Sequence, residues 1–403
     1  MDKMLRKMII ILICTFILII GSFSSLGFTY QNKKAALIPY EYYDYQNMTK
    51  DLQELYKNNT DIMKMVSLGK TYENRDVWLI KLSDNVNENE DEPGVLLIGA
   101  HHGNEKPSYE SLIFFIKHVV DYYNTENIDN DEDGTINEDP IDGKDNDNDS
   151  KIDEDPSEER VRNVVDETEI FIIPMVNPDG VEYGEDGWRK NRNPKEGQSG
   201  NIGVDLNRNY GFMWELYDIF PTKYGNFWTS QPESWNYRGE EPFSEAETTA
   251  VKNLVESEKI NISISYHSYG KWLTYPWTHT SQITPNEKLF LLIGEGIASI
   301  NGYQLYSGKS TLLPWPGGTI GTSENWLYGV HGIISFVIEL CGTRVPRNSD
   351  TVYRYCTAHV GVNLYVCEQA ASINPDKVCI TKELSTPLQH AQYLLQKIFL
   401  QLV

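Results

Sequence analysis

The sequence predicts an α/β domain in which helices flank a largely buried sheet. Apolar, strand-like runs alternate with amphipathic helical patterns over most of the 403 residues, and such alternation is typical of α/β domains. One run, Gly94–Ala100, is apolar with no polar alternation, as expected for a strand covered on both faces. With 40% apolar and 12% aromatic residues, the chain has enough apolar material for one large core.

The elements follow one another at short intervals. Strands are expected at 62–68, 77–82, 94–100, 169–176, 260–266 and 333–340, and helices at about 48–56, 109–123, 244–258, 284–300 and 350–368. Ser244 and Glu247 form a capping-box pattern, which predicts that the third helix begins at Ser244. Gly302 predicts the end of the fourth helix.

Acidic residues dominate the charge, and many of them lie in one segment. The net charge is −23, and residues 127–156 hold 13 Asp or Glu against two Lys. No basic stripe is present, so we expect no nucleic-acid partner.

This acidic segment, 127–156, contains a 16-residue repeat. Each copy has carboxylates at positions 1, 3 and 5 and an Ile at position 8. The carboxylates are Asp129, Asp131 and Asp133 in the first copy and Asp145, Asp147 and Asp149 in the second. Such spacing gathers hard oxygen ligands for Ca²⁺. The twelfth position is Pro rather than the Glu of an EF-hand, and the segment resembles thrombospondin type 3 and dockerin repeats. We expect a structural calcium-binding insertion; the alternative is a solvated acidic loop.

The N-terminus has the layout of a secretory signal. Lys3, Arg6 and Lys7 precede the apolar run Met8–Ile20, and small residues follow. We therefore expect residues 1–27 to be a signal peptide and the protein to be secreted or extracytoplasmic. The alternative is an uncleaved membrane anchor, although 13 residues are fewer than the roughly 20 that span a bilayer. If the signal is cleaved, we expect no stable membrane partner and a monomer.

Four cysteines follow the signal segment, which itself contains Cys14. Cys341, Cys356, Cys367 and Cys379 permit two disulfides in three pairings. Cys356 and Cys367 lie eleven residues apart in a helical pattern, so we do not expect them to pair with each other. The spacings contain no C-x-x-C, which argues against a second transition-metal site.

Candidate metal ligands stand at the ends of two predicted strands. His102 and Glu105 follow the 94–100 strand, and His267 follows the 260–266 strand. Two imidazoles and a carboxylate are a ligand set that catalytic zinc accepts. Asp205 is a candidate to accept the second ring proton of a ligating histidine. The alternative for His267 is a surface histidine, and His101, with Asn104 three residues on, is expected in the wall of the cleft.

Glu339 lies in an otherwise apolar strand, where an unpaired carboxylate is costly to bury. It is either half of a structural ion pair with Arg344 or a general base that activates water beside the metal. Arg189 and Arg208 are either surface charges or groups that stabilise an oxyanion and bind a carboxylate.

Six motifs now stand in a fixed order. They are His102-x-x-Glu105, Asn177-Pro178-Asp179-Gly180, Trp188-Arg189-Lys190, Asp205-x-Asn207-Arg208, His267-Ser268-Tyr269 and Glu339-Leu340. This set resembles the zinc carboxypeptidases of the carboxypeptidase A/B/T family over about residues 41–371. The resemblance implies a single domain with a mixed, twisted sheet of roughly eight strands between helices.

The resemblance also implies roles for the motif residues. His102, Glu105 and His267 would bind one catalytic Zn²⁺, Glu339 would activate water, and Arg189 would hold the oxyanion. Asn207 and Arg208 would bind the free C-terminal carboxylate of a peptide or protein substrate. Asp205 would orient the first zinc histidine, and Tyr269 would line the cleft.

Two positions bear on substrate choice. The family usually has a mobile Tyr before the strand with the catalytic Glu, but residues 313–323 contain none, and Trp315 is the candidate substitute. Glu324 occupies the base of the side-chain pocket, where family members that prefer C-terminal Lys or Arg carry an acid. The alternative is a surface Glu.

The resemblance does not extend to the two ends of the chain. Only about 14 residues separate the expected cleavage from residue 41, so no folded propeptide is expected. Residues 372–403 form a tail in which 389–402 is amphipathic.

The sequence therefore predicts a secreted zinc carboxypeptidase that cleaves the C-terminal peptide bond, with a preference for basic residues. Two alternatives stay open: a related zinc hydrolase acting on cell-wall peptides, and a catalytically silent binding protein on the same fold.

Overall fold

The computed structural model describes residues 39–125, 158–215, 227–280, 282–306, 319–373 and 378, all within one compact unit that begins at Pro39. The expected signal peptide, the calcium-type insertion with its six aspartates, Trp315 and the amphipathic part of the tail lie outside the described residues. Within these ranges, no helix combines the length and apolar character that crossing a membrane requires.

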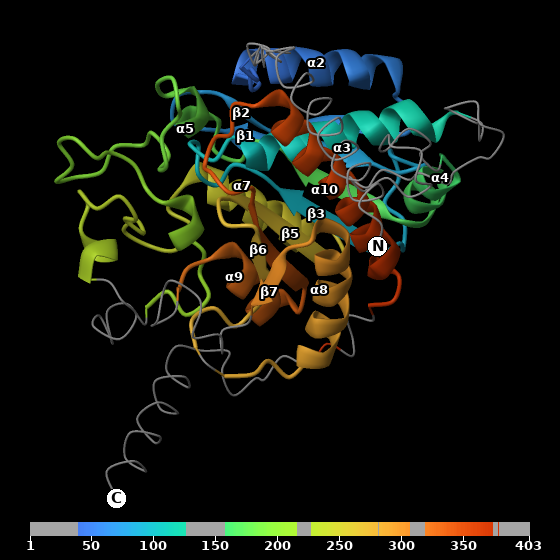
Figure 1. The fold of residues 1–403 in the computed structure, drawn as a ribbon. Helices are drawn as coiled ribbons and strands as arrows, with labels where there is room; N and C mark the ends of the chain where they lie inside the picture. The colour runs from blue at the N-terminus through green and yellow to red at the C-terminus, as the bar shows by residue number, and fades with distance from the viewer. Residues whose placement is uncertain are drawn as a thin grey trace, which may run out of the picture. The chain divides into compact units, whose positions relative to one another are not determined.

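An eight-stranded sheet forms the centre of this unit (Figure 1). Its strands are β1 (Met63–Lys70), β2 (Asp76–Leu82), β3 (Gly94–Ile98), β4 (Glu169–Ile173), β5 (Ile260–Ser268), β6 (Trp272–Thr274), β7 (Gln304–Tyr306) and β8 (Ile334–Leu340), in the spatial order β1-β2-β4-β3-β5-β8-β6-β7. The neighbours β4, β3, β5 and β8 run parallel, whereas β2 is antiparallel to β4 and β6 is antiparallel to β8. The predicted mixed sheet in a single α/β domain is confirmed.

Helices cover this sheet. They are α2 (Tyr45–Asn58), α3 (Pro107–Tyr123), α4 (Glu158–Glu167), α5 (Pro178–Glu182), α7 (Ala246–Ser257), α8 (Glu287–Asn301), α9 (Ser323–His331) and α10 (Ser349–Ala370), with two short 3-10 turns at Leu206–Arg208 and Phe227–Ser230. The helices α3, α4 and α8 pack against α10, α7 packs on β1, and α9 packs on β5 and β8.

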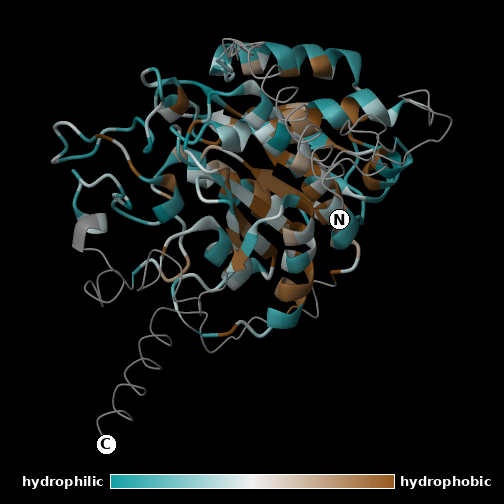
Figure 2. Cartoon of the chain, viewed as in Figure 1, coloured by the Kyte–Doolittle hydropathy of each residue, from teal (hydrophilic) through white to brown (hydrophobic). Residues whose placement is uncertain are grey.

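Burial explains why the strand pattern was readable. Every residue of β3, β4 and β5 is buried, and hydrophobic residues concentrate on these central strands (Figure 2). Surface helix α2 instead buries a narrow stripe that includes Met48 and Leu52, the spacing expected of an amphipathic helix.

Several elements have no counterpart in the sequence prediction, among them β6, β7, α4, α5 and α9. The strands β6 and β7 contain three residues each, too few to display a period of two. Helix α9 is buried from Ser323 to Gly329. It therefore has no exposed polar face over these residues, and its sequence lacks the usual amphipathic pattern. Helix α4 directly follows the acidic segment 127–156.

The capping-box prediction at Ser244 is wrong. Helix α7 has Glu245 at its N-cap and no side-chain cap hydrogen bond. The Ser244 hydroxyl donates to Glu245 Oε1 at 2.7 Å and accepts from Asn209 Nδ2 at 3.0 Å. A tertiary contact therefore occupies the group that would have capped the helix. At the end of α8, Gly302 does adopt the left-handed conformation, with φ of 68°.

The two disulfides that the sequence permits are not formed, and Cys356 and Cys367 are unpaired with each other, as expected. Cys341, Cys356 and Cys367 are free and buried, and each of the three pairings would have required a bond between two of them. Cys356 and Cys367 lie on α10, where eleven residues correspond to about 16 Å along the axis. Burial raises the pKa of the Cys341 thiol to about 12 and that of Cys367 further. Cys379 lies outside the described residues.

The turn after β3 depends on a close approach to α5. A Cβ added to Gly103 would lie 2.1 Å from the carbonyl carbon of Gly180 and 2.3 Å from the Val181 nitrogen. We predict that Gly103→Ala lowers the free energy of unfolding by about 1–3 kcal/mol, because backbone must move to admit the methyl group. Urea denaturation of the purified variant measures this.

Gly200→Ala is the matched control, since no atom lies within 4 Å of its added Cβ. We expect it to change the free energy of unfolding by less than about 0.5 kcal/mol. Equal effects of the two substitutions would contradict the packing argument.

Candidate active site

The parallel strands end at one edge of the sheet, and the candidate residues gather there. His102 stands in the turn after β3, and His267 lies near the end of β5. On the neighbouring strand β8, Glu339 is the register partner of His267, so their side chains emerge side by side on one face. Ligands of α/β domains typically bind beyond the carboxyl ends of such strands.

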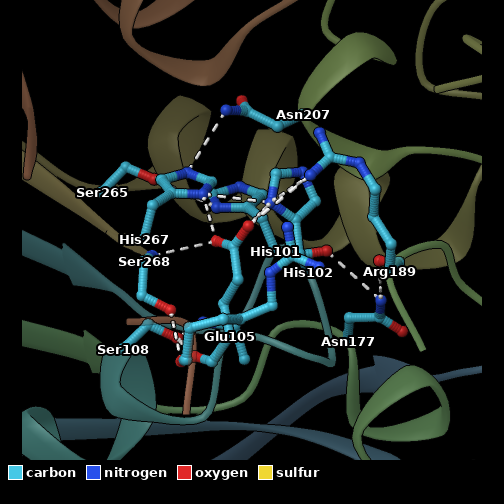
Figure 3. Close-up of polar contacts among 12 residues, drawn as sticks. His101, His102, Glu105, Ser108, Asn177, Arg189, Asn207, Ser265, His267 and Ser268 are labelled. Atoms are coloured by element: carbon cyan, nitrogen blue, oxygen red, sulfur yellow. Dashed lines mark hydrogen bonds and ion pairs between the residues drawn. The ribbon is translucent and has the colours of Figure 1, made fainter. Parts of the chain in front are cut away.

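Three buried side chains converge on one point (Figure 3). Nδ1 of His102 lies 2.9 Å from Glu105 Oε1, Nδ1 of His267 lies 2.9 Å from Glu105 Oε2, and the two nitrogens are 3.2 Å apart. Two ring nitrogens facing each other at this distance repel unless a proton or a cation lies between them. The potential ligand atoms lie within 4.8 Å of one another, and two nitrogens with one carboxylate fit a catalytic zinc site.

Asp205 determines how His102 is oriented. Its Oδ1 lies 3.0 Å from Nε2 of His102. Because a carboxylate only accepts, Nε2 must carry the proton, and the lone pair of Nδ1 is left for a metal. Burial alone would raise the pKa of Asp205, but the charges of Arg189, His102 and Arg208 hold it well below its usual range.

The second histidine is held in its neutral form. Burial lowers the pKa of His267, although the adjacent Glu105 carboxylate opposes the shift. Neutral imidazole is the form that binds metals. Glu105 stays ionised, because the two histidines outweigh the effect of burial and keep its pKa well below the usual range.

Arg189 points into the same group. Its Nη2 lies 2.8 Å from Asp205 Oδ2, and its Nη1 lies 3.5 Å from Glu105 Oε1. The guanidinium also sits 4.4 Å from the ring centroid of Trp235, within the range of a cation–π interaction. Asp205 thus fixes both the first candidate zinc ligand and the cation beside it.

These groups open into a pocket of about 470 Å³. Every site residue predicted from the sequence for zinc, catalysis or substrate lines it, and Asp205 lies behind His102; the lining members are His102, Glu105, Arg189, Asn207, Arg208, His267, Tyr269, Glu324 and Glu339. Tyr269 is 52% exposed, which places it on the open side of the pocket. Arg208 Nη1 donates to the Asn207 carbonyl at 2.6 Å, and Asn207 Oδ1 accepts from the Ser323 backbone at 2.9 Å.

Glu339 lines the pocket together with Arg189 and Arg208. Burial and the charge of Glu105 raise its pKa well above the usual range, and Arg189, Arg344 and Arg208 oppose the shift. Arg344 lines the same pocket, but in the described part of the chain the two form no ion pair within 4.0 Å. The alternative of a structural salt bridge between Glu339 and Arg344 is therefore not favoured.

A sequence model of the zinc carboxypeptidase family matches residues 48–357. The chain belongs to this family. It is 29% identical over 320 residues to a zinc carboxypeptidase of Saccharothrix mutabilis subsp. capreolus, covering 77% of this chain and 63% of that protein. It is 25% identical over 329 residues to zinc carboxypeptidase A 1 of Drosophila melanogaster, covering 78% and 63%.

The fold agrees with this membership. The structure of thrombin activatable fibrinolysis inhibitor superposes with a TM-score of 0.65 at 21% identity, over 82% of this chain and 75% of that one. The chain spans 63% of the length of each of the two relatives above.

Glu324 is buried in this zinc carboxypeptidase fold, with an exposure of 2%. Its Oε1 accepts from the hydroxyls of Thr278 at 2.8 Å and Thr322 at 2.7 Å, whereas its buried Oε2 has no partner. Burial raises its pKa, and the two hydroxyls oppose the shift. The alternative of a surface Glu is thus excluded.

Several residues of the pocket were not found from the sequence. Single threonines such as Thr278 and Thr322 carry no motif. Thr278 is brought to Glu324 by the fold, whereas Thr322 lies only two residues before it. Trp235 stood in an aromatic, Gly-rich region without a repeating pattern. His101 is misplaced by the prediction: it is fully buried and stacks parallel to His267 at 5.5 Å, behind the pocket rather than in its wall.

The position of Asp205 leads to a prediction about metal affinity. We predict that Asp205→Asn weakens zinc binding by about 10–100-fold, because a neutral amide is a weaker acceptor for the Nε2 proton of His102 than a carboxylate and can also turn its NH2 group towards that nitrogen. Competition with a chromogenic chelator measures the affinity. Asp121→Asn on the exposed side of α3 is the control, and we expect it to leave zinc affinity unchanged. Equal zinc affinity in Asp205→Asn and the parent protein would contradict the proposed orientation.

Proposed function

We propose that this protein is a zinc-dependent carboxypeptidase that hydrolyses the C-terminal peptide bond of peptides and proteins. One observation carries the proposal: a single pocket holds the metal-binding group, the Glu339 carboxylate and the two guanidinium groups of Arg189 and Arg208. Family membership supports the peptidase chemistry. The arginines and Asn207 supply what an exopeptidase needs, which is a site for a free carboxylate.

Each group has a step that its chemistry allows. His102, Glu105 and His267 would hold Zn²⁺, which supplies Lewis-acid chemistry when bound. Glu339 removes a proton from the attacking water and returns it to the leaving amine. Arg189 donates hydrogen bonds to the oxygen of the scissile carbonyl as negative charge develops there. Arg208 binds the substrate carboxylate through its planar fork, with Asn207 beside it.

We further propose that the enzyme prefers substrates ending in Lys or Arg. Glu324 keeps one buried carboxylate oxygen without a hydrogen-bond partner in the pocket wall, and an unpaired buried acceptor is costly. A cationic substrate side chain would satisfy this oxygen and favour the ionised carboxylate.

Export and calcium binding by the insertion belong to the same proposal. The charged, apolar and small-residue order of residues 1–27 supports an extracytoplasmic location, either secreted or anchored. The 16-residue repeat of Asp129–Asp149 supports calcium binding. Deletion of residues 127–156 tests the latter through the calcium dependence of melting.

The mechanism predicts a sharp effect of one substitution. Glu339→Gln should lower kcat on hippuryl or dansyl dipeptides by about 10²–10⁴-fold, because the isosteric amide cannot take a proton, while zinc content stays unchanged. Glu54→Gln on the exposed side of α2 is the control. Activity that persists in zinc-free protein, or in Glu339→Gln, would overturn the mechanism, and no activity at all in zinc-loaded protein would favour the silent binding protein.

The same assay tests the carboxylate site. C-terminally amidated peptides should be cleaved at least about 10-fold more slowly than free acids, since the charge-assisted bonds to Arg208 are lost. Equal rates would remove the exopeptidase assignment. Cleavage of cell-wall peptides alone, with dipeptides untouched, would favour the related hydrolase.

Glu324→Gln should change specificity rather than chemistry. We predict that kcat/KM for substrates ending in Lys or Arg falls by about 10–100-fold, because a charged hydrogen bond is lost, while kcat/KM for Leu or Phe stays within about threefold. The Lys-to-Leu ratio within one variant serves as the internal control. An unchanged ratio would show that Glu324 does not read the substrate side chain.

A further inference from the structure

A second group of carboxylates lies at the amino ends of β3 and β4, whereas the zinc-type group lies beyond their carboxyl ends. Asp84, Glu90 and Glu92 stand on the loop that joins β2 to β3, and each offers an oxygen within 4.8 Å of the others. This distance is informative, because two oxygens bound to one Ca²⁺ at about 2.4 Å can be at most about 4.8 Å apart.

A buried carboxylate lies under this loop. Glu169, the first residue of β4, is 1% exposed. Its Oε1 accepts from Lys81 Nζ at 2.5 Å and from the backbone N–H of Glu90 at 3.4 Å. Its other oxygen, Oε2, is buried and has no hydrogen-bond partner. This observation is independent of the loop acids, because Glu169 belongs to the sheet.

The loop acids also keep unpaired oxygens. Oδ1 of Asp84, Oε2 of Glu90 and Oε2 of Glu92 are all buried without a hydrogen-bond partner. Asn85 Nδ2 donates to the remaining oxygens of Asp84 and Glu90 at 3.1 and 3.2 Å. Buried carboxylate oxygens are almost always paired in native proteins. Three unpaired oxygens in the loop group, with that of Glu169 beside it, therefore indicate a missing partner.

Charge leads to the same conclusion. Lys81 is the cation bound to this group in the described chain, and it opposes four carboxylates. Burial and the charges of Glu90, Asp84 and Glu169 raise the pKa of Glu92 to about 7. The neighbouring Asp91 does not contribute, since its side chain is 98% exposed and pairs with Lys259 at 2.6 Å.

We propose that Asp84, Glu90 and Glu92 bind a calcium ion beside the buried carboxylate of Glu169. The donors are all carboxylate oxygens, and this argues against zinc, which prefers sites with nitrogen or sulfur ligands. Calcium accepts six to eight oxygens at flexible angles, whereas Mg²⁺ demands a tighter octahedron. The bound ion would fix the β2–β3 loop next to Glu169, the first residue of β4, and so stabilise the two strands at the ends away from His102. This site is separate from the insertion at 127–156.

The test must separate this site from the insertion. It uses the full chain with zinc bound and with the six insertion aspartates replaced by Asn, and compares melting in calcium-free buffer with melting in 5 mM CaCl₂ or MgCl₂. We expect calcium to raise the melting temperature by roughly 3–6 °C when it exceeds Kd by about 100-fold, and magnesium to raise it less. Equilibrium dialysis with radioactive calcium should count one bound ion.

Glu90→Gln/Glu92→Gln in the same background should lose the bound ion and the response to calcium. Because two repelling charges are removed, it should melt at least as high as its parent in calcium-free buffer, which shows that the variant folds. Glu54→Gln is the control and should keep the response. If the double variant fails to fold, Glu92→Gln alone in dialysis decides the matter through loss of the bound ion.

Two outcomes would overturn the proposal. One is a parent chain that binds no calcium once the insertion aspartates are replaced, and the other is a calcium response that survives the loss of Glu90 and Glu92. Neither readout requires peptidase activity, so failure of the calcium site and failure of the proposed function remain distinguishable.

Discussion

The register of the parallel strands β5 and β8 determines whether this protein has a pocket with these groups at all. His267 pairs with Glu339, and Ser265 pairs with Val337. Because side chains alternate between the two faces of a sheet, a slip of one residue would send Glu339 to the opposite face from His267. The buried apolar residues on both strands fix this register, so hydrophobic packing positions two groups that carry charge and chemistry.

Within that frame, Asp205 connects the metal-binding group to the cation beside it. Its two oxygens bind His102 Nε2 and the Arg189 guanidinium, and it is completely buried. A buried carboxylate without partners would be costly, but here each partner is itself a cation or a donor. The position of Arg189 is therefore coupled to the tautomer of His102, and a change in one is expected to disturb the other.

A structural feature could be predicted from the sequence where it depends on residues that are close together in the chain. The buried strands β3, β4 and β5 and the order of the metal-binding motifs were readable, because apolar runs and residue spacings are properties of contiguous segments. The three-residue strands β6 and β7 and the hydroxyl of Thr278 were not, since their roles depend on partners far away in the sequence. Ser244 shows the converse: a correct local pattern is overridden by a tertiary hydrogen bond to Asn209.

Calcium illustrates the same limit most clearly. The sequence predicted calcium binding only for the repeat at 127–156, because its regularly spaced aspartates form a recognisable motif. Asp84, Glu90 and Glu92 have no such period, and Glu169 lies 77 positions beyond Glu92, so the four carboxylates become a set only when β4 pairs alongside β3. The pairing of Gly94 with Glu169 is what brings them together. The two ends of these strands therefore carry different groups. Beyond the carboxyl ends lie the nitrogen and oxygen atoms of the zinc-type group, and at the amino ends lie carboxylate oxygens without hydrogen-bond partners. Strand β3 thus contributes to both sites: its pairing with β5 places His102 beside that strand, and its pairing with β4 creates the acidic group. A cation at the acidic end would therefore stabilise the sheet on which the pocket is built.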